Sequence, residues 1–213
     1  QEAFQEATQL EPQLVSAHFW LGQLAFEQGQ AEAAWRAFDT VVRLDPDNAA
    51  AYHNRGVAAY QMGLLEQAVA DLSAAKEKDP DDPQTRYQLG AVYLMQAVPA
   101  VPGAGLPDAE RLQQAKTEFQ AALDICPGMP QALIGLGNLY LVQGDTQAAI
   151  EHLQQALERE PKSPEALYAL AQAHAQQGDL EAACSTIDRF LALEVAEEWR
   201  AQGQEMRQQW NCP

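Results

Sequence analysis

The side chains that most often carry out catalysis are present, but they do not form a catalytic motif. There are four histidines, and pairs of adjacent acids stand at Asp81–Asp82 and at Glu197–Glu198. The sequence contains no G-x-S-x-G, phosphate-loop or H-E-x-x-H pattern that would place such groups beside a nucleophile, a phosphate or a metal ion. We interpret the first acid pair as a solvated linker with helix-capping duty and the second as an exposed first turn. The sequence therefore predicts no enzyme, no cofactor and no metal site.

The cysteines and the net charge exclude further kinds of site. Cys126, Cys184 and Cys212 are odd in number, far apart and without C-x-x-C spacing, so neither a disulfide framework nor a zinc site is expected. With 13 basic and 30 acidic side chains the formal net charge is −17, which repels nucleic acid and anionic lipid surfaces. The uncharged stretch 87–107 is interrupted by prolines, so this segment is not expected to insert into a membrane. The cysteine usage favours a cytoplasmic location. The alternative is an extracytoplasmic or membrane-anchored location, reached through a removed N-terminal segment.

Two residue classes repeat along the chain with the same period. Prolines that follow a polar or acidic residue are spaced by 34, 34, 47 and 34 residues, at Pro12, Pro46, Pro80, Pro127 and Pro161. Small residues inside apolar segments show the same spacings, at Gly22, Gly56, Gly90, Gly137 and Ala171. A period shared by two independent residue classes indicates a repeat architecture.

Each period contains two amphipathic helices. In the fourth, Leu133, Leu136 and Tyr140 share one face of a helix that should end at Gly144, because glycine takes the left-handed conformation without strain. The apolar face of the next helix is formed by Ala149, Leu153 and Ala156. Small residues on both helices of each pair predict a close approach between them.

These residues resemble the tetratricopeptide repeat family. Its pattern is met in the third period by Leu89, Gly90, Tyr93, Ala115, Phe119, Ala122 and Pro127. The resemblance implies an all-α fold, a right-handed superhelical solenoid of antiparallel helix pairs with a C-terminal capping helix. It divides a single domain, 1–213, into the second helix of a truncated repeat (1–12), repeats at 15–48, 49–82, 83–129, 130–163 and 164–195, and a capping helix with a tail (196–213).

Three segments depart from the repeat. Residues 1–12 match only the second half of a unit, so we expect a first helix upstream. Trp199, Met206 and Trp210 share one face of a helix expected over 196–209, which we interpret as a cap on the open side of the fifth repeat, with a partner site as the alternative. The third repeat is 13 residues longer than the others because of a Pro-rich insertion near 96–108. We favour a tolerated surface insertion over an arm that folds onto the binding surface or a neighbouring molecule.

The resemblance also implies a binding surface, since the first helices of this family line a concave groove. The predicted groove residues are Phe19, Gln23, Phe26, His53, Asn54, Tyr60, Tyr87, Gln88, Leu94, Ile134, Asn138, Leu141, Tyr168 and Gln172. They are aromatic, aliphatic and amide side chains without Lys or Arg, and of the positions read off this way only Glu165 is acidic. Amides can satisfy a peptide backbone, and apolar pockets can receive its side chains. The Lys and Arg with which some relatives hold a terminal carboxylate are missing, so that mode is disfavoured.

The sequence thus predicts a scaffold that binds a peptide or helix of an unidentified partner protein in an uncharged groove. The alternative is a self-assembling structural protein that forms homo-oligomers through the groove, the ends or the Pro-rich loop. His18 and His174 lie where the repeat has packing residues, so we expect both in the core.

Overall fold

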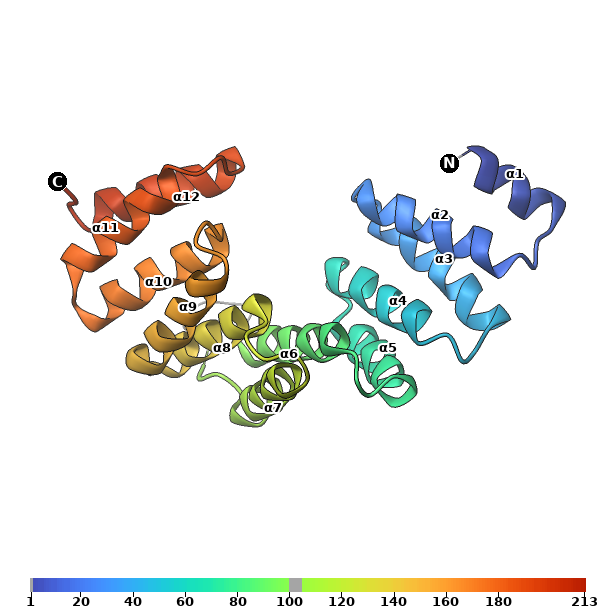
Figure 1. Ribbon diagram of the computed structural model, residues 1–213, viewed down its shortest axis with the longest axis horizontal. Coiled ribbons are helices and arrows are strands. Elements are labelled where there is room, and N and C mark those ends of the chain that lie inside the picture. Colours follow the sequence, from blue (N-terminus) through green and yellow to red (C-terminus); the bar gives the residue numbers. More distant parts are fainter. Residues whose placement is uncertain (1, 100–104) are drawn as a thin grey trace. The chain divides into compact units, whose positions relative to one another are not determined.

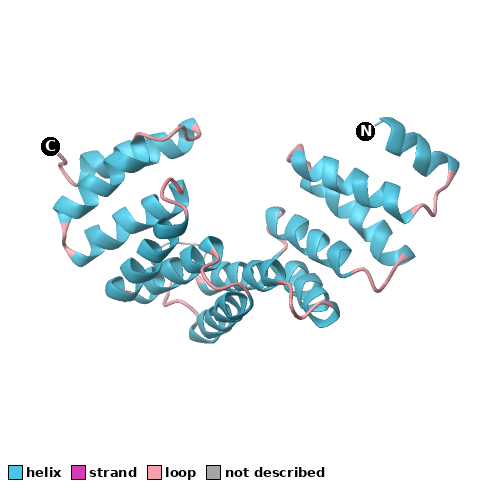
Figure 2. Ribbon diagram, in the orientation of Figure 1, coloured by secondary structure: helices cyan, strands magenta, loops and turns pink. Residues whose placement is uncertain are grey.

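The computed structural model describes residues 2–99 and 105–213, and within these ranges every regular element is an α-helix (Figures 1 and 2). The helices are α1 (Glu2–Leu10), α2 (Val15–Glu27), α3 (Ala31–Leu44), α4 (Ala49–Gln61), α5 (Leu65–Lys78), α6 (Pro83–Ala97), α7 (Ala109–Ile125), α8 (Pro130–Gln143), α9 (Thr146–Arg159), α10 (Pro164–Gln177), α11 (Leu180–Leu191) and α12 (Glu197–Gln209). This confirms the predicted all-α class. In the described ranges, no helix is both long enough and apolar enough to span a bilayer.

The chain divides into two compact units, Gln1–Gln96 and Ala97–Pro213, and each is described here by itself. In unit 1, α2 pairs with α3 and α4 with α5. In unit 2, α8 pairs with α9 and α10 with α11, and α12 packs on α11. In each pair a tight turn joins the two helices, as the repeat pattern predicts.

Short polar side chains and glycines set the helix ends. Asp145 and Asp179 accept backbone N–H bonds of Ala148 and Ala182 and so cap α9 and α11. The helices before them, α8 and α10, end at glycines in the left-handed conformation, Gly144 (φ 78°) and Gly178 (φ 91°). A β-carbon would strain the backbone at these two positions.

Small residues bring the helices of a pair together. A β-carbon added at Gly137 would lie 2.5 Å from Cγ of Leu153, so this glycine is required for α8 to approach α9. The second helices of the repeats carry fully buried alanines at equivalent positions, Ala34, Ala68, Ala115, Ala149 and Ala183. The expected close approach is thus present in the structure.

The C-terminal segment requires a correction. Cys184 on α11 and Cys212 after α12 form a disulfide with their Cα atoms 5.5 Å apart, so the expectation that the cysteines form no bridge is wrong. The two residues are 28 apart in sequence and meet because α12 folds back along α11, which their spacing alone does not reveal. Cys126 is free and exposed.

The Pro-rich insertion lies partly outside the described residues, at 100–104. Helix α6 continues to Ala97, two residues into the predicted segment, and α7 begins at Ala109. The backbone N–H of Asp108 donates to the carbonyl of Ala97 over 2.9 Å, so the ends of this segment lie side by side.

Candidate functional site

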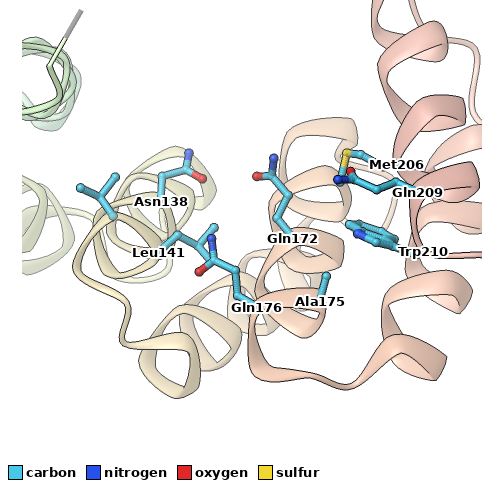
Figure 3. A pocket seen from close by; sticks show the side chains of 9 residues that line it. Asn138, Leu141, Gln172, Ala175, Gln176, Met206, Gln209 and Trp210 are labelled. Atoms are coloured by element: carbon cyan, nitrogen blue, oxygen red, sulfur yellow. The ribbon is translucent and has the colours of Figure 1, made fainter. Parts of the chain in front are cut away.

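A groove in unit 2 lies between α8, α10 and α12, and its cavity volume is about 600 Å³ (Figure 3). It is lined by Asn138, Leu141, Val142, Gln172, Ala175, Gln176, Met206, Gln209 and Trp210. We call these nine residues the amide groove. No charged side chain lines it, as the sequence analysis predicts for the groove.

The repeat itself builds the amide groove. Each of the three helices contributes residues spaced by three and then one, which is one face of a helix. The three sets are related by steps of 34 residues, so that Asn138, Gln172 and Met206 are equivalent, as are Leu141, Ala175 and Gln209, and Val142, Gln176 and Trp210. Helix α12 therefore takes the position of a further first helix and presents the same face to the groove.

Four of the lining side chains are amides, and they have no hydrogen-bond partner within the described part of the chain. They are Asn138, Gln172, Gln176 and Gln209. Each offers two N–H donors and a carbonyl acceptor, which matches the alternating N–H and C=O groups of an extended backbone. In Figure 3, Asn138 and Gln172 point into the space between their helices, and Met206 and Gln209 face them from α12.

The wall formed by α12 is attached at several points. Trp199 stacks on Tyr168 with ring centroids 6.0 Å apart and also contacts Phe190. The Arg200 guanidinium donates to the carbonyls of Leu191 and Leu193 over 3.0 and 2.9 Å. The disulfide then holds the segment just after Trp210. The apolar stripe predicted on this helix therefore has two roles, with Trp199 in the cap and Met206 and Trp210 at the groove.

Two titratable groups lie on α10 near the amide groove. Burial, and secondarily the charge of Glu205, raise the pKa of Tyr168, so this phenol stays neutral. Burial lowers the pKa of His174 despite the charge of Asp179, and the Nδ1 of this histidine is buried without a partner in the described residues. His174 is therefore neutral near pH 7.

All fourteen predicted groove residues are half-buried. Asn138, Leu141 and Gln172 line the amide groove. Leu141 also packs against the core of unit 2, as do Ile134 and Tyr168. The groove is thus assembled from only part of the predicted set.

In unit 1 the predicted residues mostly make internal contacts. Phe26 and Tyr60 pack against the cluster around Leu72. Asn54 donates to the carbonyl of Ala50 in its own helix over 2.9 Å. The remaining predicted residues of unit 1, Gln23, Tyr87, Gln88 and Leu94, are half-buried in their helices.

Phe19 lines a separate apolar pocket of about 690 Å³ at the first turns of α2 and α4. Trp20, which is 53% exposed, lies in the same pocket. Phe19 also contacts the ring of Phe38 edge to face at 5.5 Å. This pocket therefore opens beside the core of unit 1.

His53 belongs to a chain of hydrogen bonds within unit 1. The Thr85 hydroxyl donates to Asp82 over 2.5 Å, so it accepts from Nδ1 of His53, which lies 2.7 Å away. The carboxylate of Asp82 also accepts the backbone N–H groups of Gln84 and Thr85 and so caps α6. Thr85 is the middle member of this series of hydrogen bonds, and its hydroxyl donates its proton to Asp82. The series therefore links adjacent repeats and does not activate a nucleophile. His18, predicted in the core, is half-buried and lies 2.9 Å from the carbonyl of Pro12.

The fourteen predicted groove residues include three of the nine that line the amide groove and lack Val142, Ala175, Gln176, Met206, Gln209 and Trp210. The signal was available, because adding 34 to Leu141 and Val142 reaches Ala175 and Gln176, and a second step reaches Gln209 and Trp210. Interpreting the last helix as a cap outside the repeat, with a partner site as the alternative, concealed the signal.

Two family models described as tetratricopeptide repeat match the chain, one over residues 4–89 and the other over 108–153 and 134–194. No curated protein matches the sequence.

Several solved structures share the fold. TTC0263, a thermophilic TPR protein of Thermus thermophilus, is 20% identical with a TM-score of 0.76 and covers 90% of this chain and 97% of its own. YrrB, a TPR protein with an unusual peptide-binding site, is 17% identical with a TM-score of 0.61 over 95% of this chain and 98% of its own. In the APC/C hetero-tetramer Cut9-Hcn1, a chain that is 20% identical has a TM-score of 0.81 over 97% of this chain and 38% of its own. The family matches, the helix pairs and these neighbours agree, and the chain belongs to the tetratricopeptide repeat family.

Proposed function

We propose that this protein is a scaffold that holds a segment of a partner protein in the amide groove of unit 2. The observation that carries the proposal is a concave, uncharged surface on which four free amides alternate with apolar side chains. Gln176 and Gln209 are exposed and Asn138 and Gln172 are half-buried, so water solvates these amides in the free chain. Each can exchange that water for the backbone N–H and C=O groups of a ligand. Leu141, Val142 and Trp210 offer the apolar surface that a side chain of the ligand would cover.

Two comparisons support the proposal. Proteins of this family are in general scaffolds for other proteins and not enzymes, and YrrB, which has the same fold, has a peptide-binding site. The only histidine of this chain that lies in a hydrogen-bonded chain of side chains, among the described residues, is His53, and its partners serve as links between repeats. A binding role therefore fits the chain better than a catalytic one.

The test uses short random peptides displayed on phage and selected on the whole immobilised chain. A selected peptide, made synthetically, should bind the intact protein in solution. The substitution Gln176→Trp places a large ring in the amide groove at an exposed position, and it should weaken this binding by at least about tenfold. The matched control is Gln155→Trp, which changes an exposed glutamine on α9 outside the groove and should leave affinity unchanged. Circular dichroism reports whether both variants keep the fold. Equal binding to both variants would contradict the proposal.

Self-assembly through the groove remains the alternative function. It requires that mass in solution rise with protein concentration and that Gln176→Trp return the chain to monomers. Light scattering at several concentrations separates the two functions, because a scaffold for other proteins can stay monomeric.

For the cellular location we propose the extracytoplasmic alternative in place of the cytoplasmic one. It is supported by the Cys184–Cys212 disulfide, since such bridges persist mainly in oxidising compartments. The measurement is trapping of free thiols in intact cells with a maleimide that adds mass. Modification of Cys126 alone is expected, and modification of all three cysteines would contradict the proposal.

A further inference from the structure

The amide groove lies at the carboxyl ends of its three helices. Its lining residues belong to the last two turns of α8 and α10, which end at Gln143 and Gln177, and to the last turn of α12 with the Trp210 that follows it. The carboxyl end of a helix carries a partial charge of about −0.5, because the last carbonyl groups have no partner within the helix. The amino ends of α9 and α11 follow within three residues and offset part of this charge, so the negative potential of the groove depends also on the acidic side chains near it.

Among the described residues of unit 2, the basic side chains near these helix ends have other contacts. Lys116 lies over the ring of Tyr140, 5.2 Å from its centroid, and this ring packs against the core of unit 2. The last turn of α8 has no basic residue, and that of α10 has only His174, whose pKa is lowered by burial. Arg207 in the last turn of α12 is turned to the other side, where its Nε lies 2.7 Å from Asp188 on α11. The negative potential is therefore available to a ligand.

Acidic side chains next to the groove add to this potential. Asp145 and Asp179 are exposed and come directly after the glycines that end α8 and α10. Glu205 precedes Met206 on α12 and lies close enough to Tyr168 to raise the pKa of its phenol. All three acids are close in sequence to lining residues, and Asp145 and Asp179 restore negative charge at the amino ends of α9 and α11 that they cap. The lining of the groove itself contains no Lys or Arg.

We propose that the amide groove selects partner segments that carry Lys or Arg, with the cation at the helix ends and the aliphatic stem on the apolar lining. The inference rests on the function proposed above and names the chemistry of its ligand. Leu141, Val142 and Met206 can cover the stem of a long basic side chain, and the ring of Trp210 can receive its cation. An acidic segment would lose hydration in the same place without gaining a positive partner.

The test uses the peptides from the phage selection and compares the parent chain with Gln176→Trp, with a double variant and with a charge control. Selected peptides that Gln176→Trp blocks should contain more Lys and Arg than the unselected library. The double substitution Asp145→Asn with Asp179→Asn removes two charges and keeps both helix caps, since asparagine caps as well as aspartate. It should weaken a selected basic peptide by roughly three- to tenfold at low salt, and less at high salt. The control Glu158→Gln removes one charge from an exposed position on α9 and should change affinity little.

The outcomes separate this inference from the proposed function. Groove-blocked peptides without basic enrichment would overturn the inference and leave the proposed function standing. Equal affinity of a selected basic peptide for the double variant and for the parent chain would also overturn the inference and leave the proposed function standing. If Gln176→Trp blocks no selected peptide, the amide groove is not the binding site and both proposals fail.

Discussion

One repeat position carries packed aromatic rings in the first two repeats of unit 1 and groove-lining side chains in unit 2. The rings are Phe26 and Tyr60, which pack against the core of unit 1. The equivalent residues of unit 2 are Leu141, Ala175 and Gln209, and they line the amide groove. Leu141 also packs against the core of unit 2, whereas Gln209 is exposed, so this position contributes to both core and groove in unit 2.

The two units also place opposite helix ends at their pockets. The apolar pocket of unit 1 includes Val15, Ser16 and Ala50 and lies at the amino ends of α2 and α4. The amide groove of unit 2 lies at the carboxyl ends of its helices. Because the potential at a helix end changes sign between the two ends, the two sites should prefer different ligands.

The largest expected effect concerns the charged link in unit 1. Arg55 stands where unit 2 has buried Leu136 and Leu170, and its guanidinium contacts Asp71 at 2.5 Å and Asp39 at 2.8 Å. Burial alone would lower the pKa of Arg55, but these hydrogen-bonded carboxylates raise it above its usual value.

Arg55→Ala should lower the free energy of unfolding by about 3 kcal/mol, because it leaves Asp71 buried without its cation. Asp39 keeps Arg43 as a partner. The double variant Arg55→Leu with Asp71→Ala gives unit 1 the leucine that unit 2 has at this position. It should recover most of the lost free energy of unfolding. Urea unfolding measures both, and equal losses in the two variants would contradict this explanation.

The next effect concerns the disulfide of unit 2. Replacing Cys184 and Cys212 by serine should cost about 2–4 kcal/mol, because the bridge closes a loop and restrains the unfolded chain. It should also weaken groove-bound peptides, since the end of α12 supplies Trp210. Thermal unfolding and peptide titration measure the two effects, with Cys126→Ser as the control that should change neither. Unchanged peptide affinity would show that the Trp210 wall stands without the bridge.

A smaller effect compares equivalent residues of the two units. Tyr60→Ala should destabilise the fold by about 2 kcal/mol, because this half-buried ring packs against the core of unit 1. Leu141→Ala should cost about 1 kcal/mol, because this half-buried side chain also packs against the core of unit 2, and it should reduce peptide affinity, because it lines the groove. Urea unfolding and peptide titration of both variants test the comparison. Loss of peptide affinity in Tyr60→Ala and not in Leu141→Ala would contradict this comparison.

The smallest effect depends on pH. Burial lowers the pKa of His53 below its ordinary value of 6.5, despite the charge of Asp82. On acidification the unfolded chain therefore takes up this proton first, so stability should fall as the pH drops below about 6.5. Burial would raise the pKa of Asp82, but hydrogen bonds from Thr85 and two backbone N–H groups lower it. The stability that ionised Asp82 contributes is therefore lost only at more acidic pH.

His53→Gln should therefore reduce the loss of stability between about pH 7 and pH 5. Urea midpoints at the two values measure this loss, and His174, whose pKa is also lowered, supplies the part that remains. An unchanged pH dependence in the variant would show that His53 does not titrate as described.

Much of the fold could be predicted because its signals are local. The residues that end a helix, such as Gly144, and those that let two helices approach, such as Gly137, act on neighbours close in sequence. The disulfide could not be predicted from spacing, since it depends on how α12 folds back on α11.

The site could be predicted only as a set of equivalent positions. The family pattern indicated that first helices line a groove, and the positions read off from it are uncharged except for Glu165, which does not line the amide groove. It did not distinguish Tyr60, which fills its space, from Ala175, which leaves it open, because that depends on the neighbouring side chains.

The most direct test of the central claim uses the four methionines, Met62, Met95, Met129 and Met206, with carbon-13 in their methyl groups. Met206 lines the amide groove and Met129 is buried. In unit 1, Met62 follows the end of α4 and Met95 lies in α6. During titration with a selected peptide, we expect the NMR signal of Met206, assigned with Met206→Leu, to shift while the other three stay in place. A shift of Met62 or Met95 with an unchanged Met206 signal would contradict the claim that the amide groove of unit 2 is the binding site.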